Sequence, residues 1–355
     1  MPFYINIISS FFTAFIISSI VLPITIRIAI YKGLVVKPNE RSSHSRLIPT
    51  LGGMGIFIGF ILSFTLYSNF ESFPSLQYFL FAMILIFFMG MKDDVIALSA
   101  KAKALGLVFA VAILVILGDV RISSLHGILG IYDIGYWVSV LLTIFVFMTI
   151  INAVNLIDGI DGLCAITTII SSVAFSFWFV LEGSEVSIQL TILSAALIGS
   201  LIAFLRFNIS PAKIFMGDTG SLMLGYILAF IAVMFIEINT TYHGVFKLRF
   251  SPVAAIGFLA IPLTDILKVF TIRIVKGRSP FVADKRHVHH LLVDLGLTHM
   301  QATIIISLAS LFLIGLSVLL QKYGNIFSAF IIIFVGFLIV CIPNIISRFK
   351  RIKSK

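Results

Sequence analysis

The apolar run FLFAMILIFFMGM, residues 79–91, leads directly into Lys92, Asp93 and Asp94, and this stretch decides the fold. An uninterrupted apolar run favours a helix in hydrocarbon. Ionised side chains at the edge of hydrocarbon are costly unless a cation or a proton path offsets them. The stretch therefore predicts a transmembrane helix that delivers two carboxylates to the membrane boundary.

Comparable apolar runs recur along the whole chain. Of its 355 residues, 60% are hydrophobic, 11% are charged and 35 are Phe. Runs of about 17 to 25 residues cross a bilayer core of about 30 Å, and lipid leaves a backbone only helices or closed barrels. We expect such segments at residues 3–31, 50–69, 76–92, 104–118, 136–153, 164–182, 186–204, 220–238, 252–272, 303–321 and 325–347. The sequence predicts an all-α integral membrane protein, a polytopic bundle of about eleven helices, with residues 1–355 as one domain.

The basic residues are distributed unevenly among the loops. The chain has 25 Lys and Arg and a formal net charge of +10. All except Arg121, Lys247, Arg249 and Lys322 lie on one side of the predicted bundle, near residues 27–46, 92–103, 206–213, 268–286 and 348–355. Cytoplasmic loops carry this excess, so we expect a cytoplasmic C-terminus and, with an odd number of helices, an outer N-terminus. The distribution argues against nucleic acid as a partner. A small hairpin is expected within the outer loop 118–135.

Polar residues gather in the basic loops, at about 32–49, 92–103, 152–163, 205–219 and 273–302. Asp93 and Asp94 would lie at a helix C-terminus, where the dipole is already negative, so a cation or a shared proton should offset them. A solvated turn beside Lys92 is the alternative.

The loop NAVNLIDGIDGL, residues 152–163, carries two further acids. One helical turn would place Asp158 and Asp161 on the same side. Gly159 and Gly162 indicate a turn that lets backbone approach a ligand closely. A polar interhelical turn without a ligand is the alternative.

The stretch FMGDTGS, residues 215–221, opens the eighth predicted segment. We expect Asp218, Thr219 or Ser221 to cap this helix, and the glycines to leave its amide hydrogens open to an anion. Capping alone explains Asp218. It does not explain the flanking glycines at a membrane boundary, near Lys213 and Asn208.

The stretch KGRSPFVADKRHVHH, residues 276–290, holds three histidines. They could bind zinc, but no Cys accompanies them, and cations around imidazoles suit a phosphate.

The stretch KPNERSSH, residues 37–44, adds a second basic patch, unless it is ordinary positive-inside charge. Carboxylates for Mg²⁺ and cations for phosphates at a membrane surface indicate phosphoryl transfer involving a lipid. An ion-coupled secondary transporter, a metal-dependent membrane hydrolase and an inactive scaffold of the same fold remain alternatives.

The chain resembles the polyprenyl-phosphate N-acetylhexosamine-1-phosphate transferases, of the glycosyltransferase family 4 type. Five ordered motifs carry the resemblance: residues 38–44 with 52–53, 93–94, 155–163, 215–225 and 278–292. The run GRSPF at 277–281 before HVHH at 287–290 resembles the WecA and TagO branch more than the MraY branch, which has three consecutive histidines. Val36 departs from the family, which often has an acid there; we expect this to affect loop docking more than chemistry.

The resemblance implies a reaction in the bacterial inner membrane, with the active site on the cytoplasmic face. A UDP-N-acetylhexosamine gives its sugar-1-phosphate, with GlcNAc-1-phosphate expected, to undecaprenyl phosphate and releases UMP. This is the first membrane step of a cell-envelope polysaccharide such as O-antigen or teichoic acid. An MraY-like enzyme using another UDP-amino sugar is the alternative, and a homodimer is possible.

The resemblance also assigns roles by motif. Asp218 and Asp94 would bind Mg²⁺, for which Mn²⁺ could substitute. The catalytic residues would be Asp93, Asp94, His287, His289 and His290. The substrate-binding residues would be Asn155, Asp158, Asp161, Gly162, Leu163, Asn208, Lys213, Phe215, Arg278, Lys37, Arg41 and His44. Among these, Asp161 to Leu163 would line a uridine pocket in which Phe215 stacks on the base. Direct in-line attack is preferred to a covalent aspartyl-phosphate, which stays open.

Overall fold

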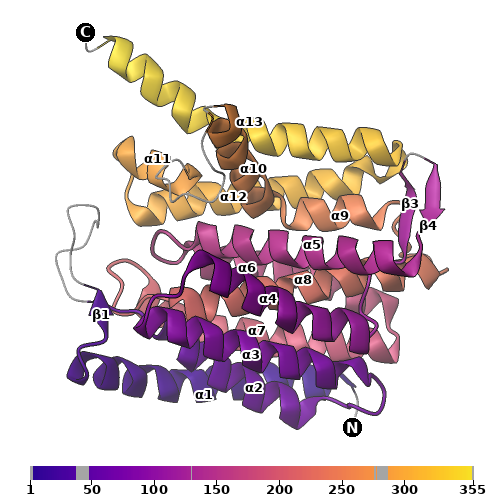
Figure 1. The fold of residues 1–355 in the computed structure, drawn as a ribbon, viewed down its shortest axis with the longest axis horizontal. Coiled ribbons are helices and arrows are strands. Elements are labelled where there is room, and N and C mark those ends of the chain that lie inside the picture. The colour runs from indigo at the N-terminus through magenta and orange to yellow at the C-terminus, as the bar shows by residue number, and fades with distance from the viewer. Residues whose placement is uncertain (1–2, 37–47, 129, 276, 278–286, 354–355) are drawn as a thin grey trace.

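The computed structural model describes residues 3–36, 48–128, 130–275, 277 and 287–353. Most helices run side by side along one direction, and α10 lies across them (Figure 1). The helices are α1 (Phe3–Tyr31), α2 (Gly52–Tyr67), α3 (Ser75–Val95), α4 (Ala100–Leu117), α5 (Tyr136–Ile157), α6 (Leu163–Glu182), α7 (Glu185–Asn208), α8 (Gly217–Thr241), α9 (Ser251–Phe258), α10 (Ala260–Val275), α11 (Val288–Asp294), α12 (His299–Leu319) and α13 (Asn325–Lys353), with the 3₁₀ helix η1 (Leu320–Lys322). Two short antiparallel pairs complete the described part: β1 (Val35–Val36) with β2 (Ile48–Pro49), and β3 (Ser124–Ile128) with β4 (Ile131–Asp133).

The chain is a multi-pass membrane protein. Nine described helices are long and apolar enough to cross a membrane, or ten if one bent pair forms a single span. Each of the eleven predicted segments falls on a helix, but two of them differ from a simple span. Helix α2 has only 16 residues, about 24 Å at 1.5 Å per residue. The segment predicted over 252–272 is broken into α9 and α10, which meet at 79°.

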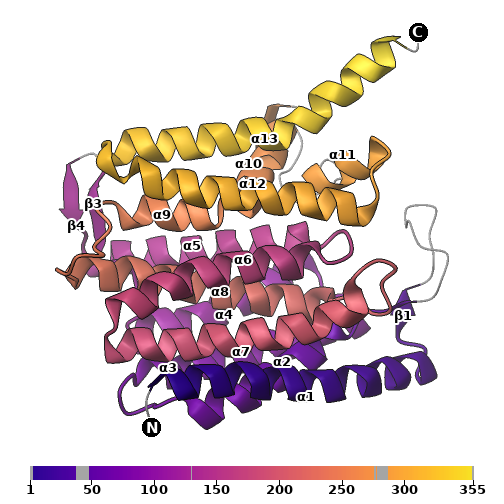
Figure 2. The ribbon, with the colours of Figure 1, turned by 180° about the vertical axis from the view of Figure 1, so that it is seen from behind.

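Helix α8 forms the core of the bundle. In its most apolar window 83% of the residues are buried, against 22% for α1 and 28% for α13, which face outward. Figures 1 and 2, drawn from opposite sides, both show α8 covered by other helices. Its neighbours approach closely because small residues stand at the contacts; a Cβ on Gly225 would lie 2.6 Å from the Cα of Ile151 in α5. The element that carries Asp218 is therefore fixed on all sides.

The two ends of the bundle differ in chemistry. The N-terminus and the β3–β4 hairpin lie at one end, and β1 and α11 lie at the other (Figure 1). This confirms the hairpin predicted within 118–135. Because successive helices alternate in direction, the loops after α3, α5 and α7 all reach the end with β1 and α11. The acids Asp93, Asp158 and Asp218 therefore meet there.

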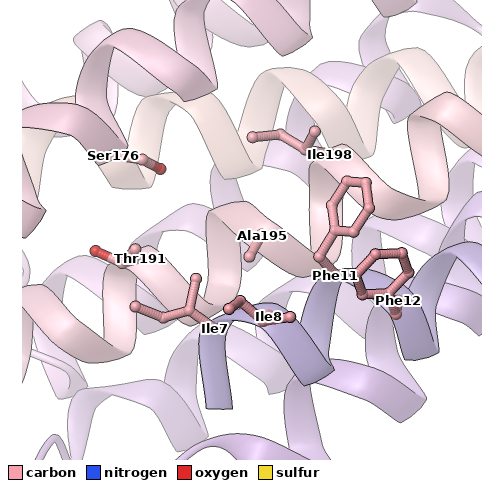
Figure 3. Close-up of a pocket in the computed structure, with 8 residues that line it drawn as sticks. All are labelled: Ile7, Ile8, Phe11, Phe12, Ser176, Thr191, Ala195 and Ile198. Carbon is pink, nitrogen blue, oxygen red and sulfur yellow. The ribbon is translucent and has the colours of Figure 1, made fainter. Parts of the chain in front are cut away.

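A separate apolar cavity of about 330 Å³ opens between α1, α6 and α7. Ile7, Ile8, Phe11, Phe12, Ser176, Thr191, Ala195 and Ile198 line it (Figure 3). Ile8 and Phe12 belong to the outward face of α1, near the N-terminus. None of the lining side chains is ionisable, so this cavity is distinct from the acidic end of the bundle.

Candidate active site

Asp94, at the end of α3, caps the N-terminus of α8. Its Oδ1 accepts the Asp218 backbone N–H at 2.8 Å, and its Oδ2 accepts the Thr219 N–H at 2.9 Å and the Thr219 hydroxyl at 2.5 Å. No side-chain bond caps the helix at Met216, which precedes it. The expectation that Asp218, Thr219 or Ser221 caps its own helix is therefore wrong. The amides expected to stay open for an anion already bind one, because a carboxylate suits the positive end of a helix.

Asp93 points to a different set of partners from its neighbour Asp94. Its Oδ1 accepts the Leu98 N–H at 2.6 Å. Its Oδ2 lies 3.0 Å from Nζ of Lys103, which lies 2.6 Å from Oδ2 of Asp218. The cation expected to offset the adjacent acids is thus Lys103, which bridges two carboxylates from different helices.

Lys103 was not among the residues singled out in the sequence. A signal for it existed, since it stands in the first turn of α4, which Ser99 caps by accepting the Ala102 N–H. A cation is unfavourable at the positive end of a helix. A lysine there therefore indicates a nearby acid that compensates it.

Asn155, near the end of α5, completes the surroundings of Asp218. Its Nδ2 donates to Oδ1 of Asp218 at 2.6 Å and to Oγ of Ser221 at 2.8 Å. The Asp218 side chain is 33% exposed, against 10% for Asp93 and 20% for Lys103. Asp218 is therefore more accessible than Asp93 and Lys103. We call the group Asp93, Lys103, Asn155 and Asp218 the acid cluster.

The acid cluster has the donors that a Mg²⁺ ion requires. Mg²⁺ is bound in proteins by one or two carboxylates, with substrate phosphate oxygens and water completing its shell. The ammonium of Lys103 already lies where Asp93 and Asp218 converge, which marks a place that attracts a cation. Asp94 fits this role less well, since three donors from α8 occupy its oxygens. Within the described ranges, no group of three or more His, Cys, Asp or Glu residues is placed to hold a metal ion.

The turn between α5 and α6 separates Asp158 from Asp161. Helix α5 ends at Ile157 and α6 begins at Leu163, with Gly162 at φ 76°. The predicted turn is confirmed, but the two acids do not share the side of a helix. Oδ2 of Asp161 instead accepts the Ala212 N–H at 3.3 Å, inside the protein.

Several residues expected to bind substrate are internal. Asp161, Leu163 and Asn208 are 1%, 0% and 6% exposed. Asn208 accepts the Gly162 N–H and donates to the Ile214 carbonyl, each at 2.8 Å. Their described contacts join the loop after α5 to the loop after α7. They shape the site from behind and do not form its surface.

Phe215 and Lys213 stand in the loop before α8 and are not fully buried. Phe215 is half-buried, and its backbone pairs with Pro49 and Gly52, at 2.7 and 2.9 Å. Lys213 is exposed. The four predicted residues Lys37, Arg41, His44 and Arg278 lie outside the described residues.

The histidine segment reaches the turn after α5. A Cβ on Gly159 would lie 2.0 Å from Nε2 of His289, so this glycine is what lets the ring pack against the turn. His289 is 1% exposed, and burial together with neighbouring His290 holds its pKa well below the usual range. Nδ1 of His287 lies 2.7 Å from Oδ2 of Asp265, an acid in α10 that the sequence reasoning also missed. A charged residue inside the apolar run 252–272 was the signal for it.

Comparison with known proteins identifies the family. The sequence model described as glycosyl transferase family 4 matches residues 76–236. The probable undecaprenyl-phosphate N-acetylglucosaminyl 1-phosphate transferase of Bacillus subtilis (strain 168) is 33% identical over 333 residues, covering 93% of this chain and 89% of the relative. The chain belongs to glycosyl transferase family 4. The undecaprenyl-phosphate alpha-N-acetylglucosaminyl 1-phosphate transferase of Salmonella typhi is 30% identical, covering 87% of this chain and 83% of the relative. The protein of the same name from Escherichia coli (strain K12) is 31% identical, covering 86% and 82%.

The family 4 match spans α3 to α8 and therefore contains the whole acid cluster. It also contains Asp94 and Asp158, but it ends before the histidine segment. The similarity to the relatives extends over most of the chain, so the resemblance drawn from the five motifs is confirmed.

Asp158 adds a titratable group to this family 4 site. Burial, and then the charges of Asp218, Asp94 and Asp161, raise the pKa of Asp158 from 3.8 to about 7. Near neutral pH a large fraction of Asp158 is therefore protonated. A protonated carboxyl can donate a hydrogen bond to an anion, whereas an ionised one would repel it.

The raised pKa of Asp158 predicts a pH-dependent stability. An acid whose pKa is raised in the folded state does not lower the free energy of unfolding below pH 3.8. Its destabilising contribution grows as the pH rises from 3.8 to about 7. In metal-free buffer, Asp158→Asn should stabilise the protein by about 1 to 4 kcal/mol at pH 8 and by almost nothing at pH 4. Thermal unfolding across this pH range measures the effect. An equal gain at both pH values would contradict it.

Proposed function

We propose that the chain transfers N-acetylglucosamine-1-phosphate from UDP-N-acetylglucosamine to undecaprenyl phosphate, releasing UMP and forming a lipid-linked pyrophosphate sugar. The observation that carries the proposal is the acid cluster: Lys103 joins Asp93 and Asp218 at one end of a membrane bundle. The names of the family 4 relatives supply the acceptor lipid and the transferred group.

The orientation follows from charge. Among the described residues, Lys92, Lys101, Arg206 and Lys213 lie at or just beyond the ends of α3, α4 and α7 nearest the acid cluster. An excess of basic residues marks cytoplasmic loops. We therefore place the acid cluster on the cytoplasmic face of the bacterial inner membrane, where a soluble nucleotide sugar and a membrane lipid meet. With eleven spans, the N-terminus lies outside.

The chemistry needed is charge neutralisation more than proton abstraction. A phosphate monoester has a second pKa near 6, so the acceptor is mostly a dianion at pH 7 and already nucleophilic. An acceptor oxygen forms a bond to the β-phosphorus of the donor. The bond from that phosphorus to the oxygen bridging to the α-phosphorus breaks, and UMP leaves with this oxygen and its charge. Both reactants are anions, so preorganised positive charge is the main catalytic contribution expected.

Residues of the chain can supply this positive charge, either directly or by holding a cation. Asp93 and Asp218 would hold Mg²⁺, with Mn²⁺ as a substitute, and the bound ion would neutralise phosphate charge. Lys103 provides a fixed ammonium beside them. Asp94 holds the N-terminus of α8 in place and so positions Asp218. His287 would donate a hydrogen bond to the diphosphate of the donor.

The test is UMP release by membranes that contain this chain, given UDP-N-acetylglucosamine, undecaprenyl phosphate and Mg²⁺. Release should require both lipid and metal. Asp218→Asn should lower it at least about a hundredfold, equivalent to about 2.7 kcal/mol. Asp133→Asn is the matched control, because Asp133 is exposed in β4 at the opposite end. Activity only with another UDP-amino sugar would change the donor, as in the MraY-like alternative. Folded protein that releases UMP from no donor would exclude the transferase.

A further inference from the structure

A second group of charges lies buried outside the acid cluster. Asp265 and Lys268 in α10 are 2% and 0% exposed, and His287 is 3% exposed. Oδ1 of Asp265 lies 2.8 Å from Nζ of Lys268, and Oδ2 lies 2.7 Å from Nδ1 of His287. Ionised groups removed from water are expensive even when they are paired. In a membrane protein such groups mark function more often than stability.

The bend between α9 and α10, at Leu259, determines the position of this buried group of charges. Helix α10 leaves α9 at 79° and crosses the direction of the other helices next to α13 (Figure 1). Nζ of Lys268 also donates to the Val340 carbonyl in α13 at 3.4 Å, one turn before Pro343. Lys268 is therefore held by two helices, and it fixes the position of Asp265 while neutralising its charge.

Asp265 holds His287 at two points. Its Oδ1 accepts the backbone N–H of Val288 at 2.9 Å, at the start of α11, while its Oδ2 binds the ring. The other ring nitrogen of His287, Nε2, is buried and has no hydrogen-bond partner among the residues that the structure describes. A buried polar atom without a partner is rare and needs an explanation. A ligand that reaches Nε2 would provide one.

We infer that Asp265 is a positioning residue for His287: its carboxylate accepts the Nδ1–H and orients the ring so that, in the doubly protonated imidazole, Nε2–H donates to a phosphate oxygen of the substrates. The arrangement is that of an acid that fixes the tautomer and orientation of a working imidazole. The inference rests on the proposed function, which gives His287 its contact with phosphate. A purely structural role, joining α10, α11 and α13, is the competing explanation.

The test needs variants that separate positioning from folding. Asp265→Asn alone would leave Lys268 buried without its partner and would destabilise the protein. The double variant Asp265→Asn/Lys268→Met removes both charges, and methionine nearly preserves the length of the lysine. An asparagine at this position carries no negative charge, so it no longer stabilises the doubly protonated imidazole that donates to phosphate. Lys268→Met alone is the contrasting variant, because it loses the bond to α13 while the Asp265 carboxylate keeps His287 and the Val288 N–H as partners.

Thermal unfolding, kcat and KM for UDP-N-acetylglucosamine would be measured for each variant. We expect the double variant to fold and to lose at least about thirtyfold in kcat with little change in KM, while Lys268→Met retains at least about a third of the activity. His287→Gln should lose at least about a hundredfold. Adding the double variant to His287→Gln should lower kcat by less than about threefold more, because both act through one imidazole.

Three results would overturn the inference. Multiplicative losses when the changes are combined would show that Asp265 acts independently of His287. Equal losses in Lys268→Met and the double variant would show that the group only joins helices. Normal kcat in His287→Gln would remove the residue on which Asp265 is inferred to act. Failure of the wild-type protein to release UMP from any donor is a different outcome, because it refutes the proposed function itself.

Discussion

Replacing Lys103 by methionine is expected to lower kcat for UMP release by about a hundredfold to a thousandfold, the usual effect of removing one preorganised charge or donor from a transition state. The Lys103 ammonium lies 3.0 Å from Asp93 and 2.6 Å from Asp218. Its loss removes fixed positive charge from the point where two phosphates must approach each other. It also leaves the two carboxylates to repel each other and the substrates.

The measurement is UMP release across a Mg²⁺ titration. Lys101→Met is the control, because Lys101 stands only two positions before Lys103 in α4 and is exposed. If Lys103 has a catalytic role, saturating Mg²⁺ will not restore the activity of the variant. Activity within about threefold of the wild type at high Mg²⁺ would contradict this role. Lys103 would then only balance the carboxylates in the absence of metal.

Gly53→Ala is expected to have the largest effect on the structure of the site. A Cβ at this position of α2 would lie 2.2 Å from the Gly220 nitrogen and 2.7 Å from the Thr219 carbonyl carbon. Backbone atoms cannot move aside as the end of a side chain can. Helix α8 must therefore shift next to Asp218, and overpacking of this kind costs about 1 to 3 kcal/mol or more. We expect a lower unfolding temperature and at least about a tenfold loss of UMP release.

Gly55→Ala in the same helix is the matched control. A Cβ there would first meet the end of the Leu22 side chain, at 2.5 Å, which can change its rotamer. Its effect should be clearly smaller in both thermal unfolding and activity. Equal effects from the two substitutions would show that α2 tolerates no added methyl group, and that contact with α8 is not the cause.

The membrane architecture was predictable because it depends on local composition. Apolar runs of sufficient length form helices in lipid wherever they occur, so every predicted segment falls on a helix. The break at Leu259 was not predictable in this way. Both halves of the segment 252–272 are apolar, and only packing of α10 against its neighbours distinguishes a bend from a straight helix.

The sequence predicted which loops and most of which acids form the site. Asp93, Asp94, Asn155 and Asp218 do converge, as motif order implied. Their individual roles were not predictable, because adjacent side chains on one helix point in different directions. Asp94 turns to the amides of α8, while Asp93 turns to a lysine of α4.

Hydropathy and charge act residue by residue, so the residues alone predicted a membrane bundle with acids and basic loops at one end. The family was also predictable, because its five motifs are recognised in order from the residues alone. The partner of each charge became known only from the folded structure. Lys103 and Asp218 are 115 positions apart, and Asp265 and His287 are 22 apart. Pairs at such separations form through the packing of whole helices, and no local pattern specifies them.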